Sequence, residues 1–165
     1  MLGSLGWATA HVTGNKLDYC VLGCCGLYVI RRDCKGTFRL QFRTDRLVPE
    51  DPLYIPMAQI YDHCLKDYGT ADRIMRGSVY GRVGGIQLND LVLVLSAGVA
   101  LYMGDAALLA LVNFHVDGGG NYDPEVIARA IIHEGQRVQK VAGGAPSACL
   151  VYAVKVAQDV ANIST

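Results

Sequence analysis

The sequence predicts an α+β fold with a mainly antiparallel sheet. Three features support this class: hairpin patterns fill the first 45 residues, further strand-like segments follow an expected helix, and the end of the chain has helical periodicity. Strands joined by tight turns favour antiparallel pairing, and runs of strands separate from runs of helices are typical of α+β proteins. No stretch with the composition of a linker divides the chain, so we expect one domain over residues 1–165.

The N-terminal strands are predicted from the turns between them. Gly14-Asn15 is a two-residue loop that accepts positive φ, and Gly36 suits the left-handed position of a three-residue hairpin loop. Leu17–Ile30 is apolar on both faces, so we expect a central pair of strands there. The four strands of this β-meander are Trp7–Thr13, Lys16–Gly23, Gly26–Asp33 and Thr37–Asp45.

A helix and a second β region are expected to follow the meander. Pro49 and Pro52 mark a loop, and Pro56 suits the first position of a helix over 56–69, where apolar residues recur at helical spacing. Runs of apolar and β-branched residues then predict more strands, although the last of them is alanine-rich and short helical turns are the alternative there. These strands are Val79–Val83, Leu91–Leu95, Val99–Met103 and Leu108–Val116.

The C-terminal segments are expected to be helical. Asp123 suits a helix N-cap, Pro124 the first helical position and Glu125 the first turn. Gly143-Gly144 breaks the chain, and a last helix is preferred for the segment that follows. A strand over Ser147–Val156 is the alternative, because that segment is rich in β-branched residues.

Composition and charge narrow the classes of function. The 15 basic and 15 acidic residues cancel, whereas nucleic-acid binders usually have a basic excess. No apolar run reaches the ~20 residues that cross a bilayer, and the N-terminus lacks a signal-peptide pattern, so we expect the cytoplasm or another reducing compartment. Because 52% of the residues are hydrophobic and 18% charged, we also expect apolar surface to be buried by self-association.

The pattern of cysteines is consistent either with zinc ligands or with residues of the hydrophobic core. Cys20-x3-Cys24 has the spacing of half a zinc site, and Cys34 and His11 would have to supply the other half. Cys24 and Cys25 are adjacent, so they point to opposite faces of a strand, and their neighbours are apolar. We therefore predict buried free thiols and no metal site.

Two short segments resemble papain-like and NlpC/P60-like cysteine hydrolases. One is the run Cys25–Val29, and the other is the pair Asp90–Val92 and Val99–Asp105. The resemblance implies that Cys25 is the nucleophile and begins a helix. The base histidine of these families would fall near Gly98, where this sequence has none, so His115 would have to be the base.

Other residues are candidates for a catalytic or ligand-binding site. His115 and Asp117 would lie on one face of an extended chain, where they could form an acid–base pair. Glycine loops before two expected helices can hold an anion on backbone N–H groups. Arg39 and Arg43 are expected on one face of the second hairpin, where they could contact phosphate. The loop residues are Gly118, Gly119, Gly120, Gly143, Gly144 and Ser147.

Two functions from different classes follow from these features. We favour a non-enzymatic structural or assembly subunit of a homo-oligomer, because no catalytic constellation is complete and the composition is apolar. The alternative is a small hydrolase or a phosphate- or nucleotide-ligand binder that uses His115, Asp117 and the two glycine loops. The sequence identifies no cofactor.

Overall fold

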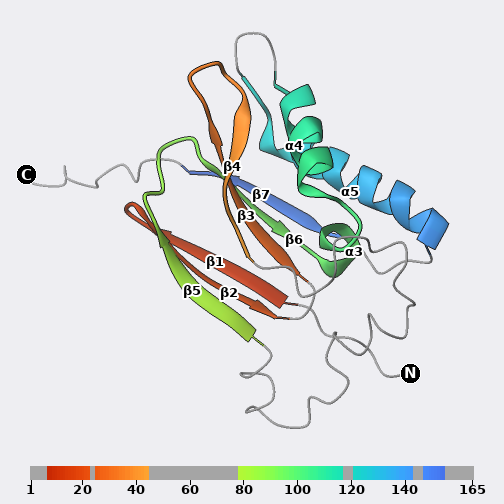
Figure 1. The fold of residues 1–165 in the computed structure, drawn as a ribbon, viewed down its shortest axis with the longest axis horizontal. Helices are drawn as coiled ribbons and strands as arrows, with labels where there is room; N and C mark the ends of the chain where they lie inside the picture. The colour runs from red at the N-terminus through yellow and green to blue at the C-terminus, as the bar shows by residue number, and fades with distance from the viewer. Residues whose placement is uncertain (1–6, 23–24, 45–77, 117–120, 143–146, 155–165) are drawn as a thin grey trace, which may run out of the picture.

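Two antiparallel sheets and a layer of helices form three layers in the described part of the chain (Figure 1). The computed structural model describes residues 7–22, 25–44, 78–116, 121–142 and 147–154 of the 165. The predicted α+β class with antiparallel sheets is confirmed. The helix expected over 56–69 lies outside the described residues.

The first sheet has three strands in the order β1-β2-β5. Gly14 has a φ of +57° in the turn between the first two strands, as the sequence predicts. Leu17 and Val21 of the middle strand are buried and face the second sheet, where they pack with residues such as Leu27 and Val92. The strands are β1 (Trp7–Thr13), β2 (Lys16–Leu22) and β5 (Ser78–Gly84).

The second sheet has four strands in the order β4-β3-β6-β7, and it separates the first sheet from the helices. Gly36 has a φ of +85° in the hairpin that joins β3 to β4, which confirms the predicted loop. The central pair expected across Leu17–Ile30 does not form, because β2 pairs with β5 and β3 pairs with β6. The strands are β3 (Gly26–Arg32), β4 (Phe38–Arg43), β6 (Leu91–Leu95) and β7 (Cys149–Ala153).

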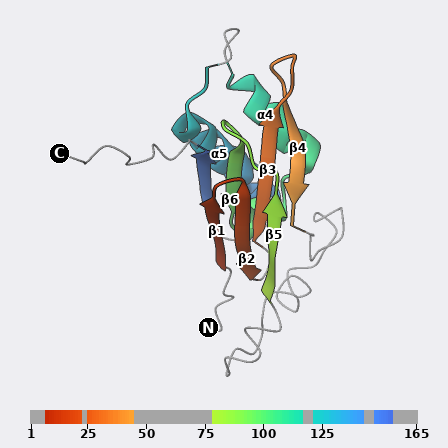
Figure 2. The same cartoon turned by 90° about the vertical axis from the view of Figure 1, so that its left-hand side faces the viewer.

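Three helices in the described ranges cover the face of the second sheet that the first sheet leaves open (Figure 2). The longest begins as predicted, since Oδ1 of Asp123 accepts the backbone N–H of Glu125 at 2.8 Å. No helix in these ranges is both long enough and apolar enough to cross a membrane. The helices are α3 (Ala97–Ala100), α4 (Asp105–Phe114) and α5 (Pro124–Ala142).

For three segments, the secondary structure that the sequence predicts is wrong. The sequence predicts a strand over Val99–Met103, but this segment holds the end of α3 and the turn after it. The strand predicted over Leu108–Val116 falls mostly in α4, where Leu108 and Val112 lie four residues apart on one buried face. The preferred C-terminal helix is also wrong, and its alternative is correct. Strand β7 pairs with β6 and alternates between half-buried residues and exposed ones such as Leu150 and Tyr152.

The hydrophobic core lies on both faces of the second sheet. Along β3, Leu27 and Val29 join the cluster between the two sheets, whereas Tyr28 and Ile30 join the cluster beneath the helices. Strand β6 alternates in the same way, with Leu93 on the helical side. This burial on both faces explains why these strands are apolar throughout.

We expect Leu93→Ala to lower the free energy of unfolding by about 2–5 kcal/mol, because a fully buried side chain would leave a cavity between β6 and the helices. The matched control is Leu88→Ala, whose side chain is 54% exposed and should change stability by no more than about 0.5 kcal/mol. Urea unfolding followed by circular dichroism measures both values. Equal losses would contradict the assigned core.

Candidate functional site: a basic cleft at one end of the second sheet

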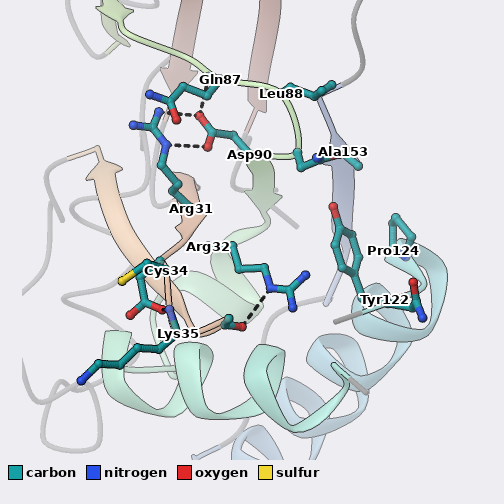
Figure 3. Close-up of a pocket in the computed structure, with 14 residues that line it drawn as sticks. Arg31, Arg32, Cys34, Lys35, Gln87, Leu88, Asp90, Tyr122, Pro124 and Ala153 are labelled. Atoms are coloured by element: carbon teal, nitrogen blue, oxygen red, sulfur yellow. Dashed lines mark hydrogen bonds and ion pairs between the residues drawn. The ribbon is translucent and has the colours of Figure 1, made fainter. Parts of the chain in front are cut away.

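A cleft of about 1010 Å³ opens at one end of the second sheet (Figure 3). Its walls come from segments far apart in the sequence: the tip of the β3–β4 hairpin, the turn before β6, the end of β7 and the start of α5. The volume is at the upper end of the about 300–1,000 Å³ that is usual for small-molecule sites. Three basic and two acidic residues line the cleft, namely Arg31, Arg32, Lys35, Asp33 and Asp90.

An ion pair between Arg31 and Asp90 forms one wall of the cleft. The carboxylate of Asp90 is completely buried and accepts hydrogen bonds of 2.8 Å from Nε and Nη2 of Arg31. It also accepts the backbone N–H of Gln87 at 2.8 Å, while Nη2 of Arg31 donates to the carbonyl of Gly85 at 2.6 Å. The hydrogen bonds to Asp90 raise the pKa of Arg31, although burial opposes them. These bonds tie the end of β3 to the turn before β6.

The hairpin tip is held by Asp33. Oδ1 of this residue accepts the backbone N–H groups of Lys35 and Thr37, both at 2.9 Å, and Oδ2 accepts Nε of Arg39 at 3.1 Å. The bond from Thr37 and the Arg39 side chain hold the pKa of Asp33 below its usual value. Asp33 and Asp90 thus each have an arginine partner of their own, Arg39 and Arg31 respectively.

Arg32 and Tyr122 face each other across the cleft (Figure 3). Nε of Arg32 donates to the carbonyl of Gly36 at 3.0 Å, which positions the guanidinium beside the hairpin. The ring of Tyr122 meets Phe38 edge to face, with centroids 5.4 Å apart. Burial raises the pKa of Tyr122, whereas the charge of Arg32 lowers it, so the hydroxyl is protonated at neutral pH and can donate a hydrogen bond.

These side chains equip the cleft for binding an anion. A planar guanidinium matches the oxygens of a phosphate or carboxylate, and the tyrosine adds a ring and a neutral donor. Within the described ranges, no three His, Cys, Asp or Glu side chains gather closely enough to hold a metal ion. The chemistry that these described side chains support is the recognition of negative charge.

His115 lies near the cleft, but not in the geometry that the sequence predicts. It is the C-cap of α4, with φ −92° and ψ 15°, so the extended backbone that the sequence predicts is not present at His115, and the pairing with Asp117 stays a prediction. His115 stacks edge to face on Phe114 and lines a smaller cavity of about 430 Å³ beside Tyr122. Asp117 and Gly118–Gly120 lie outside the described residues.

The second glycine loop does not lead into a helix. Ser147 is followed by strand β7, so the helix N-terminus that was expected to bind an anion after this loop is absent from the described chain. Gly143 and Gly144 lie outside the described residues. The expected helical anion site does not form at Ser147, because the residues that follow pair with β6 as a strand.

Arg39 and Arg43 do not share a face of the hairpin. The register of β4 against β3 shifts between Val29 and Ile30, and this β-bulge reverses the alternation of side chains. Arg39 lies opposite Arg31 and pairs with Asp33, outside the helical layer. Arg43 instead reaches Asp105 at the start of α4, at 3.0 Å.

The cysteines in the described ranges have different surroundings. Cys34 is exposed at the hairpin tip, so the prediction that it is buried is wrong, while Cys20, Cys25 and Cys149 are partly buried. Cys25 directly precedes strand β3, whereas the cysteine-hydrolase resemblance would need it to begin a helix. Cys24 and Cys64 lie outside the described residues.

Comparison with known proteins gives matches in structure only. No family model and no curated protein matches the sequence. Among solved structures, the serine/threonine phosphatase Stp1 from Staphylococcus aureus matches over 88% of this chain and 54% of its own, with 15% identity and a TM-score of 0.60. The two chains share a fold. The S. agalactiae serine/threonine phosphatase matches over 88% of this chain and 57% of its own, with 14% identity and a TM-score of 0.56.

A third phosphatase-fold structure broadens the comparison. The photosystem II phosphatase PBCP matches over 91% of this chain at 15% identity, with a TM-score of 0.54. The chain covers only 64% of that protein, and little more than half of the two bacterial phosphatases, at 54% and 57%. The expectation of a non-enzymatic structural or assembly subunit is wrong, because these proteins, which share the fold of this chain, are phosphatases.

The residues that build the cleft could not be identified from the sequence. Arg31 and Arg32 stand in a basic stretch of the sequence, but Asp90, the partner of Arg31, lies 59 residues away. Tyr122, which faces Arg32 across the cleft, comes from the segment before α5. A single aspartate before the apolar strand Leu91–Leu95 was a weak signal for a buried ion pair. Nothing in the local pattern identified Tyr122.

We expect Asp90→Asn to lower the free energy of unfolding by roughly 2–4 kcal/mol, because Arg31 would lose its carboxylate in a mostly buried place. The matched control, Asp18→Asn, removes an exposed partner of Arg82 and should leave stability within experimental error. Thermal and urea unfolding report both effects. Equal stability of the two variants would show that the buried pair does not hold the cleft together.

We expect a thiol-alkylating reagent at pH 8 to label Cys34 much faster than Cys149. Burial raises the pKa of the Cys149 thiol to about 12, so only about one molecule in 10⁴ carries the thiolate at that pH. Cys34 is exposed at the hairpin tip. Peptide mass spectrometry after timed exposure to iodoacetamide measures both rates. In the unfolded chain the difference should disappear, and a difference that persists in urea would refute burial as its cause.

Proposed function

We propose that the chain is a phosphatase domain that hydrolyses phosphate monoesters of serine or threonine residues in proteins. The observation that supports this function is the fold, which spans 88% of the chain in the match to Stp1. At 15% identity the match bears on the fold, and the chain spans 54% of that protein.

The proposed reaction breaks one bond and forms another. The oxygen of water bonds to phosphorus, the bond between phosphorus and the serine or threonine oxygen breaks, and the water proton ends on that leaving oxygen. Negative charge is spread over the phosphoryl oxygens in the transition state, so fixed cations and hydrogen-bond donors stabilise it. Arginines held in place, such as Arg31 and Arg32, are the kind of group that this chemistry uses.

We expect the purified chain to release inorganic phosphate from a phosphothreonine peptide at least about 10²-fold faster than a matched control preparation. The control is Leu93→Asp, purified in the same way. A carboxylate at this fully buried position of β6 should prevent folding, so any activity left in that preparation comes from contaminating phosphatases. Phosphate release is measured with and without added Mg²⁺ and Mn²⁺.

The substrate series makes the test sharper. Phosphoserine and phosphothreonine peptides should be hydrolysed, with a phosphotyrosine peptide of the same sequence as the comparison. Release no faster than in the Leu93→Asp preparation, under every metal condition, would overturn the proposed hydrolysis. Preferential release from the phosphotyrosine peptide would overturn the proposed substrate class.

A further inference from the structure

We propose that strand β7 is a self-association edge, at which two copies of this chain pair their β7 strands antiparallel about Val151. The proposal goes beyond the proposed phosphatase function and does not depend on it. It rests on three features of β7: backbone groups that face outward, an exposed apolar face, and a sequence that can pair with a second copy of itself.

Strand β7, blue in Figure 1, is an edge of the second sheet, because β6 is its only neighbouring strand among the described residues. In an antiparallel pair, alternate residues direct their backbone N–H and C=O groups toward the same neighbour. The N–H of Val154 donates to the carbonyl of Asp90 at 2.9 Å, so the even-numbered residues of β7 face β6. The outward-facing backbone groups therefore belong to Cys149, Val151 and Ala153, and they can pair with another strand.

The side chains of β7 divide between a covered face and an open one. Cys149, Val151 and Ala153 pack against the core beneath the helices. Leu150 and Tyr152 lie on the opposite face of the strand and are 57% and 47% exposed. A second strand laid alongside β7 would remove part of these two side chains from water, which favours association.

Nothing in β7 protects this edge from pairing. Natural edge strands are commonly protected by charged side chains, prolines or β-bulges, and the five residues of β7 include none of these. The other edge of the same sheet, β4, has Arg39 and Arg43 in the strand and a register shift in its pairing with β3. Association through β7 is therefore expected to stop at two copies, because the far edge of each sheet resists further pairing.

The sequence of β7 favours a second copy as the partner. An antiparallel pair centred on Val151 places Leu150 opposite Tyr152 of the second copy, where aromatic and aliphatic side chains contact each other. Cys149 then lies opposite Ala153 and Val151 opposite its own copy, so the outward-facing backbone groups meet and exchange their hydrogen bonds. No charge meets its own copy, because the strand has no charged residue.

The small size of this interface sets its expected strength. One strand pair with two exposed side chains from each copy buries less surface than the about 1,200–2,000 Å² of a stable complex. We therefore expect a reversible dimer with a Kd of about 10–100 μM, not an obligate one.

The first test follows the mass of the full chain by analytical ultracentrifugation from about 5 to 500 μM, a range that brackets the expected Kd. We expect the mass to rise from that of one copy toward that of two. Tyr152→Glu should weaken the dimer at least about tenfold, because a carboxylate would be buried against Leu150 of the second copy. The matched control is Tyr80→Glu, on an edge strand of the first sheet, where the tyrosine is 74% exposed; this change should leave the Kd unchanged.

Disulfide cross-linking tests the register. A mixture of Leu150→Cys and Tyr152→Cys chains should form linked dimers under mild oxidation, because opposite residues at such positions have Cα atoms about 4.5 Å apart, within reach of a disulfide. Each variant alone should cross-link at least about fivefold less, because its two new thiols would be diagonal neighbours about 7–8 Å apart. All chains carry Cys34→Ser, which removes the exposed thiol, and chains with that change alone give the background.

Several results would overturn the proposal. A single copy at every concentration would leave the edge to a strand of another protein, and masses above two copies would contradict a closed pair. Equal effects of Tyr152→Glu and Tyr80→Glu would mean that another surface associates. Cross-linking of each cysteine variant alone as fast as of the mixture would exclude the register centred on Val151. Should Tyr152→Glu fail to fold, as judged by circular dichroism, the cysteine variants still decide the outcome.

Discussion

Burial of β3 and β6 on both faces is the constraint on which the rest of the structure depends. Leu27 and Val29 face the first sheet, and Tyr28 and Ile30 face the helices, so one pair of strands supplies the centre of both cores. Each layer outside the second sheet then needs only one apolar face. This explains why β2, in the first sheet, carries Lys16 and Asp18, whereas β3 has no charged residue before Arg31 and β6 has none.

The cleft lies at the ends of β3 and β6 that extend beyond the two hydrophobic clusters. Ile30 is completely buried, and the next two residues of β3, Arg31 and Arg32, are the first charged side chains of that strand. Asp90 directly precedes β6 and remains buried, so it needs a partner from the neighbouring strand. Arg31 meets that need, and Arg32 points toward the other side of the sheet end. The same packing that fixes the fold thereby places a guanidinium in a preformed hollow.

The sequence predicted the features that depend on local chemistry. Glycines with positive φ at the two hairpin turns, and the capping by Asp123 ahead of Pro124, need only neighbouring residues. The sequence did not predict the features that depend on contacts between distant segments. These are the division of the hairpins between two sheets, the pairing of β7 with β6, and the bulge that separates Arg39 from Arg43. Most of the cleft also depends on contacts between distant segments, because its walls come from four separate segments.

The error in the favoured function has the same origin. The apolar composition, with 52% hydrophobic residues, was attributed to surfaces buried between subunits. A sheet with a core on each face buries more apolar residues per strand than a sheet with one wet face, so the fold itself accounts for the excess. Self-association stays a prediction, but the composition no longer argues for it. An incomplete catalytic pattern in the sequence was likewise weak support for a non-enzyme, since residues such as Arg31 and Asp90, which are 59 positions apart, meet only in the folded chain.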